Sequence, residues 1–365
     1  MAAIHQFLAG YSKGDAISNE ARVLRALFRK WGATSTIFCE ASCIHPELRR
    51  DVMDVHTCVV NPEDIVLLHL SIGSIVNEVF ARLSCQKAIL YHNITPHEFF
   101  VTFKPQAAEK LRLGRDQMEG LAGAAQVNMA DSEYNSRELK SAGYLDVRVL
   151  PIVLDFKYLA EKPDAKVLCD YQDEKKNILF VGRCAPNKCI DDLVRTFAYY
   201  QQHVEPHSRL IHVGSFTGME AYYSLCRIQA KNLGLRDVHF MGSVTQSQLS
   251  AFYHVADVFL SVSEHEGFCI PLLESMYFDV PILAYAAGAV AETLAESGIL
   301  FRKKDKAQIA EMMGRLTRNT SLRNAVIHDQ RQRLQQYQSL DLEVVLRKTF
   351  TPLLENDPSS DSNAG

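Results

Sequence analysis

Two glutamates stand eight residues apart in the stretch EHEGFCIPLLE, which runs from Glu264 to Glu274. Carboxylates such as those of Glu266 and Glu274 accept hydrogen bonds from the paired hydroxyls that sugars and riboses present. Pro271 suits the first position of a helix, and the free N–H groups at a helix N-terminus favour an anion. Gly267 would let a phosphate approach the backbone closely. This stretch therefore predicts a site for a ligand that carries both hydroxyls and phosphate.

An arginine and a lysine form a second candidate group. Arg183 and Lys188 follow the apolar run NILFVG. Two cations at a strand end can neutralise a diphosphate and the charge that it gains when a glycosidic bond breaks. Structural alternatives remain open: the two cations could simply flank a surface loop, Glu274 could interact with its helix dipole, and Glu266 could be solvated.

Short β-rich apolar runs alternate with helical patterns along most of the chain, which is typical of βαβ units and parallel sheets. Ligands of such sheets bind outside the carboxyl ends of the strands, so we expect the site in loops that follow strands. The strands are predicted at Ala3 to Leu8, Thr34 to Cys39, Asp64 to Leu70, Lys87 to His92, Gln126 to Ala130, Val147 to Leu150, Asn177 to Gly182, Arg209 to Val213, Val238 to Met241, Val258 to Val262, Val280 to Tyr285 and Ile299 to Phe301.

The length of 365 residues exceeds what one hydrophobic core usually supports. We expect an α/β protein with two doubly wound, Rossmann-like parallel-sheet domains that face a cleft. The charged stretch at 158–176 is interpreted as a linker, and the polar tail at 355–365 as disordered. The predicted parts are a first domain at 1–157, the linker, a second domain at 177–337, a helix crossing back to the first domain at 338–354, and the tail.

The stretch EHEGFCIPLLE is similar to the E-x7-E motif of retaining GT-B glycosyltransferases of family 4, the mannosyltransferase-like glycosyl transferases group 1. The whole chain resembles a member of this family, which implies the GT-B fold, with 1–157 as the acceptor-side domain and 177–337 as the nucleotide-sugar-binding domain. In the family the second glutamate usually holds the nucleotide ribose and the first contacts the donor sugar, which implies these roles for Glu274 and Glu266. The stretch VGRCAPNKCIDDLV is similar to the family's G-R-x4-K, which implies diphosphate contacts for Arg183 and Lys188.

The resemblance also implies roles for residues outside these motifs. His92 matches a histidine near the C6 hydroxyl of the donor sugar, although it could instead be hydrogen-bonded within a loop, and His97 could compete for the role. Asp15, His69 and His97 are candidates for the acceptor side, with helix N-capping as the alternative for Asp15. Cys269 departs from a frequent glycine. The implied donor-binding set, beyond the charged residues, is Gly14, Gly214, Val244, Gly267, Phe268, Cys269 and Ile270.

The expected activity is that of a metal-independent hexosyltransferase. The sequence contains no D-x-D motif, no HExxH motif and no clustered Cys/His set, so we expect neither a metal nor a cofactor. The family resemblance implies a same-face reaction in which the leaving phosphate accepts the acceptor's proton. Glu266 would then position the sugar rather than act as a base, and Glu266, Arg183, Lys188 and His92 form the catalytic set.

The implied partners are a nucleotide-diphosphate sugar and the hydroxyl of a glycan, a lipid-linked glycan or a small molecule. We favour GDP-mannose, because AAGAVAETL resembles mannosyltransferase-like relatives, and leave UDP sugars open. A dinucleotide-dependent oxidoreductase would need a G-x-G-x-x-G turn, which is absent. A sugar-nucleotide epimerase on the same scaffold and a non-catalytic sugar-nucleotide-binding protein remain alternatives.

Composition sets the remaining expectations. A formal net charge of −4 gives no footprint for nucleic acid. The nine cysteines lack CxxC spacing and the N-terminus lacks the pattern of a signal peptide, so a cytoplasmic protein is expected. Two basic groups could contact the inner face of the membrane, although a basic face is more often solvated. They are Arg22, Arg25, Arg29 and Lys30, and Lys104, Lys110, Arg112 and Arg115.

Overall fold

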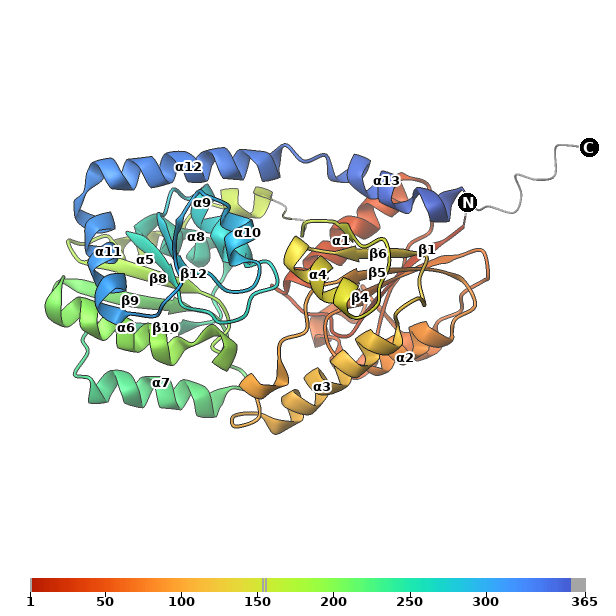
Figure 1. The fold of residues 1–365 in the computed structure, drawn as a ribbon, viewed down its shortest axis with the longest axis horizontal. Helices are drawn as coiled ribbons and strands as arrows, with labels where there is room; N and C mark the ends of the chain where they lie inside the picture. The colour runs from red at the N-terminus through yellow and green to blue at the C-terminus, as the bar shows by residue number, and fades with distance from the viewer. Residues whose placement is uncertain (1, 153, 155, 356–365) are drawn as a thin grey trace, which may run out of the picture. The chain divides into compact units, whose positions relative to one another are not determined.

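The computed structural model describes residues 2–152, 154 and 156–355, and the chain divides into two compact units. Unit 1 comprises Met1–Glu98, Gln106–Asp155 and Asp341–Gly365, and unit 2 comprises Phe99–Pro105 and Phe156–Leu340. Each unit contains one sheet flanked by helices (Figure 1). The predicted fold class, α/β with two doubly wound parallel-sheet domains, is confirmed.

The sheet of unit 1 has seven strands in the order β3-β2-β1-β4-β5-β6-β7, and its described pairs are parallel. The chain changes direction across the sheet between β1 and β4, where open α/β sheets bind ligands. Tyr91 pairs with both Leu70 and Ala130, so the residues that follow β5 and β6 emerge at one edge. The strands are β1 Ile4–Leu8, β2 Ile37–Cys39, β3 Met53–Asp54, β4 Ile65–Leu70, β5 Gln86–Tyr91, β6 Val127–Ala130 and β7 Arg148–Val149.

The last helix of the chain belongs to unit 1. Phe350 of α13 packs against Phe28 and Trp31 of the first helical segment, with ring centroids 5.4 Å and 6.4 Å apart. These contacts join the end of the chain to the first core. The helices are α1 Ala16–Lys30, α2 Ile75–Arg82, α3 Pro105–Gly120, α4 Glu133–Ser141 and α13 Leu342–Leu354, with 3-10 turns at Ala41–Cys43, Pro46–Leu48, Val55–Thr57 and His97–Phe99.

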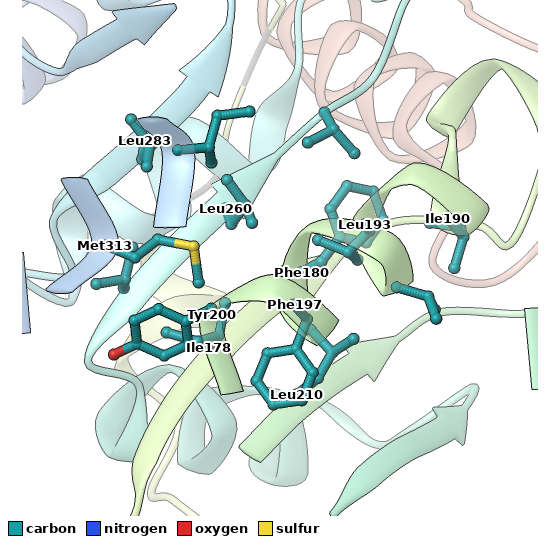
Figure 2. Close-up of a cluster of buried hydrophobic side chains, with 14 of the residues drawn as sticks. Ile178, Phe180, Ile190, Leu193, Phe197, Tyr200, Leu210, Leu260, Leu283 and Met313 are labelled. Carbon is teal, nitrogen blue, oxygen red and sulfur yellow. The ribbon is translucent and has the colours of Figure 1, made fainter. Parts of the chain in front are cut away.

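Unit 2 has a six-stranded sheet in the order β10-β9-β8-β11-β12-β13, again parallel, with the change of direction between β8 and β11. Figure 2 shows part of its core, where Phe180, Leu210 and Leu260 of the sheet meet side chains of α6 and α11. The strands are β8 Lys176–Val181, β9 Ser208–Val213, β10 Val238–Gly242, β11 Val258–Ser261, β12 Ile282–Tyr285 and β13 Ile299–Phe301.

Among the helices of unit 2, α6 packs on α7 and α11, α5 packs on α8, and α9 packs on α12. They are α5 Ala165–Tyr171, α6 Ile190–His203, α7 Glu220–Asn232, α8 Gln246–Val255, α9 Ile270–Tyr277, α10 Val290–Leu294, α11 Lys306–Arg318 and α12 Thr320–Gln338, with 3-10 turns at Phe156–Ala160 and Pro186–Lys188. No helix among the described residues is both long and apolar enough to cross a membrane.

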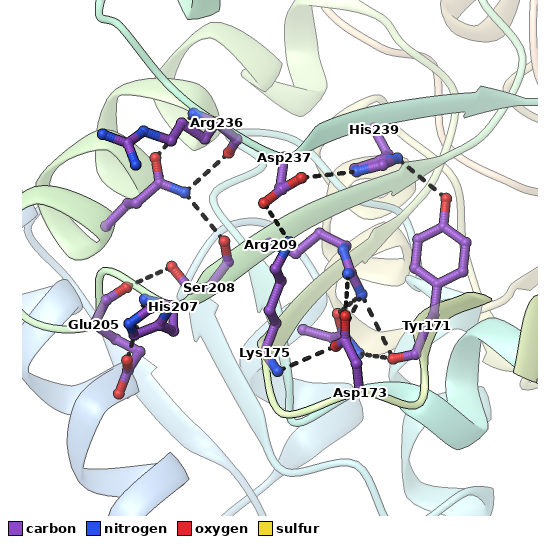
Figure 3. Close-up of polar contacts among 12 residues, drawn as sticks. Tyr171, Asp173, Lys175, Glu205, His207, Ser208, Arg209, Arg236, Asp237 and His239 are labelled. Atoms are coloured by element: carbon purple, nitrogen blue, oxygen red, sulfur yellow. Dashed lines mark hydrogen bonds and ion pairs between the residues drawn. The ribbon is translucent and has the colours of Figure 1, made fainter. Parts of the chain in front are cut away.

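The segment predicted as a linker, 158–176, lies within unit 2. Its residues Ala165–Tyr171 form the helix α5. Arg209 of β9 is buried, and its guanidinium donates to the Asp173 carboxylate at 2.7 Å and to the Asn177 side chain at 3.0 Å (Figure 3). The charged composition of 158–176 suggested a linker, but the Asp173 carboxylate in this segment pairs with the buried Arg209 of the sheet.

Other boundaries also differ from the sequence prediction. Phe99–Pro105, expected within the first domain, belongs to unit 2, and the helical end at 338–354 is divided between the end of α12 and α13. The short edge strand β3 was not predicted, because two half-exposed residues, Met53 and Asp54, carry no strand pattern. The predicted tail, 355–365, lies outside the described residues except for Glu355.

Candidate functional site

The loop between β11 and α9 carries Glu266 and is held by the loop that follows β12. The backbone N–H of Ala289 donates to the carbonyl oxygen of Glu266 at 2.9 Å. Gly288 has a φ of +56°, and a Cβ atom there would collide with the same carbonyl. Only glycine suits this contact, because it has no Cβ and tolerates positive φ. Glu266 and the half-buried Gly267 after it are therefore positioned by backbone contacts.

The end of this loop turns into α9 through a residue in the left-handed conformation. Cys269 has a φ of 72°, which is uncommon for a residue other than glycine, and burial raises the pKa of its thiol. The hydroxyl of Thr293, on α10, donates to the carbonyl of the buried Phe268 at 2.7 Å and so stabilises the turn. Ile270 is the first residue of α9, so Pro271 is the second and not the first as the sequence suggested.

Lys188 and Glu266 form an ion pair at the carboxyl edge of the sheet. The ammonium of Lys188 lies 2.6 Å from a carboxylate oxygen of Glu266, and their side chains are 22% and 7% exposed. Burial alone would lower the pKa of Lys188, but the Glu266 carboxylate overrides this and raises the pKa. The Glu266 carboxylate thus balances the positive charge of Lys188, and the ion pair holds the Glu266 side chain in place.

Arg183 lies in the loop after β8 and is exposed. Its guanidinium donates to the carbonyl of Thr217 at 2.9 Å. The ammonium of Lys104 lies beside Gly218 in the same loop, with the Arg183 guanidinium close by. The pKa of Glu220 is lowered first by the Gly218 N–H and then by Lys104 and Arg183. A second cation therefore accompanies Arg183 in unit 2.

Sequence reasoning missed this position of Lys104 and grouped it with a basic face for a membrane. Lys104 belongs to Phe99–Pro105, which packs on unit 2 through Phe103, whose ring lies 5.0 Å from that of Tyr222. Phe99 likewise lies 6.4 Å, between ring centroids, from His265. The aromatic residues of this segment were the available signal, because they indicate a segment that packs against a core.

Glu274 is buried on α9, and both of its carboxylate oxygens accept hydrogen bonds from tyrosines. Tyr158 donates to one oxygen at 2.8 Å and Tyr253 to the other at 2.6 Å. Burial raises the pKa of Glu274, and the two tyrosine hydrogen bonds oppose the rise. Each carboxylate oxygen has a second lone pair, so ligand hydroxyls can still bind. Neither tyrosine was identified from the sequence, and Tyr158 lay in the supposed linker.

The small residues predicted for the donor follow the strands β8 to β10. Gly214 follows β9, and a Cβ atom there would collide with the carbonyl oxygen of Gly182. Its N–H donates to the carbonyl of Gly242 at 2.9 Å. Val244 is half-buried, next to Thr245, which caps α8. Gly214 is thus required for packing between neighbouring loops, in addition to any ligand contact.

The remaining predicted residues lie in unit 1. Gly14 is exposed with a φ of +69°, and Asp15 caps α1 by accepting a hydrogen bond from the N–H of Ser18 at 2.8 Å. This capping is the alternative that the sequence offered for Asp15. His97 is half-buried and lies 3.5 Å from the carboxylate of Glu98. An acceptor-side role for Asp15 or His97 stays a prediction.

His69 and His92 form a buried pair in which ring nitrogens approach to 2.9 Å. A carboxylate oxygen of Glu20 lies 3.5 Å from one nitrogen of His92, and one of Asp131 lies 3.6 Å from the other. Burial lowers the pKa of His69 far below its usual value. Burial also acts to lower the pKa of His92, but Asp131 and Glu20 raise it above the usual value.

Among the described residues, two groups of side chains have atoms close enough to surround a cation, all within 4.8 Å of one another. The first is Glu20, His69 and His92, whose ring nitrogens are already directed at each other. The second is Cys189, Asp192 and Glu264, where the Lys304 ammonium lies 3.0 Å and 2.7 Å from the two carboxylates. We assign a metal site to neither group. The expectation of a metal-independent protein stays a prediction.

The fold of this chain is shared with several solved structures. A sucrose-phosphate synthase from Thermosynechococcus elongatus superposes with a TM-score of 0.76 and 16% identity, covering 97% of this chain and 99% of that one. The Anabaena protein HepE in complex with UDP and glucose gives a TM-score of 0.73 and 15% identity, with the same coverage of 97% and 99%. The chain has the α/β fold of GT-B glycosyltransferases.

Sequence comparison relates a segment of unit 2 to a known family. Residues 170–333 match the family model of glycosyl transferases group 1. An uncharacterized glycosyltransferase from Methanocaldococcus jannaschii is 30% identical over 162 residues. That alignment covers 43% of this chain and 40% of the relative, less than half of each. The group 1 resemblance that the sequence suggested is thereby supported for this domain.

Proposed function

We propose that the protein is a metal-independent, retaining hexosyltransferase of family 4. It would move a hexosyl group from a nucleotide-diphosphate sugar to a hydroxyl of a glycan, a lipid-linked glycan or a small molecule. One observation carries the proposal: Glu266, paired with Lys188, and Glu274, held by two tyrosines, are both buried within the segment that matches the group 1 family model. Two fixed buried carboxylates suit a ligand that presents hydroxyls.

The proposed donor site follows from these positions. Glu274 would accept hydrogen bonds from the ribose, and Glu266 from the donor sugar. Arg183 and Lys104 would bind the diphosphate, because both are cations that lie together at the loop after β9. The N-terminus of α9 adds backbone N–H groups for the same anion. Charge that develops on the leaving diphosphate is then met by groups already in place, which lowers the barrier.

The pairing of Glu266 supports a positioning role for this residue. Its carboxylate is already engaged by the Lys188 ammonium at 2.6 Å, in an ion pair that fixes its position. We therefore propose that the acceptor's proton passes to the leaving phosphate, on the same face of the sugar. Glu266 orients the sugar and stabilises positive charge at the anomeric carbon.

The donor is proposed to be a nucleotide-diphosphate sugar, with GDP-mannose favoured over UDP sugars on the sequence resemblance. HepE, which shares the fold, was solved with UDP and glucose, which supports a nucleotide sugar in general. A thermal-shift screen tests the choice, because a ligand that binds only the folded state raises the melting temperature. A shift with GDP-mannose larger than that with UDP-glucose supports the preference, and the reverse order overturns it.

Product analysis tests the activity itself. Purified protein is incubated with the donor selected by the screen, with and without candidate acceptors, and products are separated by mass spectrometry. Glu266→Ala and Arg183→Ala should remain folded and lose transfer. Full activity in either variant refutes the proposed site. A changed donor sugar in the absence of any acceptor would instead support the epimerase alternative.

A further inference from the structure

A row of contacting polar side chains crosses the centre of unit 1. Gln6 of β1 contacts His69 of β4 at 3.0 Å, and His69 contacts His92 after β5 at 2.9 Å. His92 lies 3.6 Å from Asp131, which follows β6. All four residues are buried. Four neighbouring strands of one sheet thus each contribute one member, and the row ends at the edge where ligands of such sheets bind.

The backbone carbonyl of Ala21 determines which atoms donate and which accept in these hydrogen bonds. The side-chain NH2 of Gln6 donates to the carbonyl oxygen of Ala21 at 2.9 Å. The amide oxygen of Gln6 therefore faces Nε2 of His69, and an oxygen can only accept, so His69 carries its proton on Nε2. The pKa of His69 is lowered by burial, so the ring is neutral and its Nδ1 has no proton. Nδ1 of His69 must then accept a hydrogen bond from Nε2 of His92.

Carboxylates surround His92 on the other sides. Asp131 lies 3.6 Å from Nδ1 of His92, and Glu20 of α1 lies 3.5 Å from Nε2. Asp15, at the start of α1, adds a weaker attraction in the same direction. The side chains of His92, Glu20 and Asp131 are at most 2% exposed, so solvent screens these charges little. Nε2 of His92 is thus hydrogen-bonded to His69, whereas Nδ1 has a carboxylate 3.6 Å away, at ion-pair distance, and no direct hydrogen bond among the described residues.

We infer that Gln6 and His69 are positioning residues, which hold His92 as an imidazolium with its Nε2–H group directed at Nδ1 of His69. An imidazolium has no lone pair, so His92 cannot take a proton from an acceptor hydroxyl. Its part in transfer is that of a fixed positive charge at the carboxyl end of β5. This consequence rests on the proposed function, whereas the protonation state and the tautomers do not.

Nitrogen NMR of histidine-labelled protein tests the inference without any substrate. Long-range correlations identify which ring nitrogens carry protons, and a His92→Gln variant assigns the signals of His92. We expect both nitrogens of His92 to be protonated at neutral pH, while His69 is protonated on Nε2 alone. A neutral His92, or a His69 protonated on Nδ1, overturns the inference.

A Gln6→Leu variant tests the part of Gln6. Without the amide oxygen, nothing requires the proton of His69 on Nε2, so His69 is free to donate through Nδ1, and the titration of His92 moves to lower pH. Gln117 serves as the matched control, because this half-buried glutamine of unit 1 bonds Ser74 and Asn77. Gln117→Leu should leave the signals of both histidines unchanged. Equal effects of the two variants contradict a specific role for Gln6.

Activity measurements then separate this inference from the proposed function. In the wild type, the pH dependence of turnover should fall on the alkaline side in step with the His92 titration. In Gln6→Leu that fall should move to lower pH by the same shift. Absence of any transfer, with the NMR result as expected, refutes the proposed function and leaves the protonation state standing. Transfer whose alkaline limb does not move in Gln6→Leu refutes the role of His92 as a fixed charge.

Discussion

Replacing Lys188 with methionine leaves the Glu266 carboxylate buried without its cation. Removing one partner of a buried ion pair typically costs about 3–5 kcal/mol. Lys188 is 22% exposed and Glu266 7%, so water screens part of this penalty and we expect about 2–3 kcal/mol. In a domain of this size each kcal/mol lowers the melting temperature by about 2–4 °C. Lys188→Met should therefore melt roughly 4–12 °C lower than the wild type.

The double variant Lys188→Met/Glu266→Gln separates stability from function. It removes both charges and keeps both side-chain volumes, and replacing a whole buried pair is often neutral. We expect the double variant to recover most of the stability that Lys188→Met loses, but to show no transfer activity. Differential scanning calorimetry and a product assay measure the two effects on the same preparations.

Two controls define what would refute this reasoning. Lys166→Met removes the exposed pair with Asp170 in the same unit, whose side chains are 85% and 49% exposed, and should leave the melting temperature unchanged because water already screens both charges. If Lys188→Met melts within about 2 °C of the wild type, the pair is not desolvated as described. A double variant that transfers sugar at the wild-type rate would show that Glu266 does not contact the donor.

Three further predictions concern the other donor-side groups. Lys104→Ser should raise the KM for the donor about tenfold in steady-state kinetics, because one charge-assisted contact is lost. Lys110→Ser, on the exposed face of α3, is the control and should leave this KM unchanged. Tyr158→Phe removes one hydrogen bond to Glu274 and should lower the free energy of unfolding by about 1–2 kcal/mol and weaken donor binding in calorimetry. Because the folded protein raises the pKa of Glu274 above 4.5, it binds more protons than the unfolded chain just above that pH, so this carboxyl reduces stability as pH rises. Denaturant titrations should find a weaker decline in Glu274→Gln, and an unchanged decline would contradict the burial of this charge.

Much of the fold could be predicted from the sequence because parallel strands buried on both faces read as apolar runs. The run IVLLHL of β4 is an example, since all six residues are buried. The two-residue strand β3 could not be predicted, because its pairing with β2 depends on a neighbour distant in sequence and not on its own composition. The segment at 158–176 was misread for a related reason. Asp173 is charged, but its partner Arg209 lies on a strand 36 residues away.

The sequence by itself determined the residue types of the candidate site. Arg183, Lys188 and Glu266 lie in segments that follow strands, and Glu274 stands eight residues after Glu266 on the next helix. Only the tertiary structure decided which of them act together. Lys188 balances Glu266 rather than standing free beside Arg183, and Lys104 reaches Arg183 from a segment of the first half of the chain. Hydrogen-bond direction, burial and charge balance depend on atoms brought together by folding, and spacing along one strand or loop does not contain them.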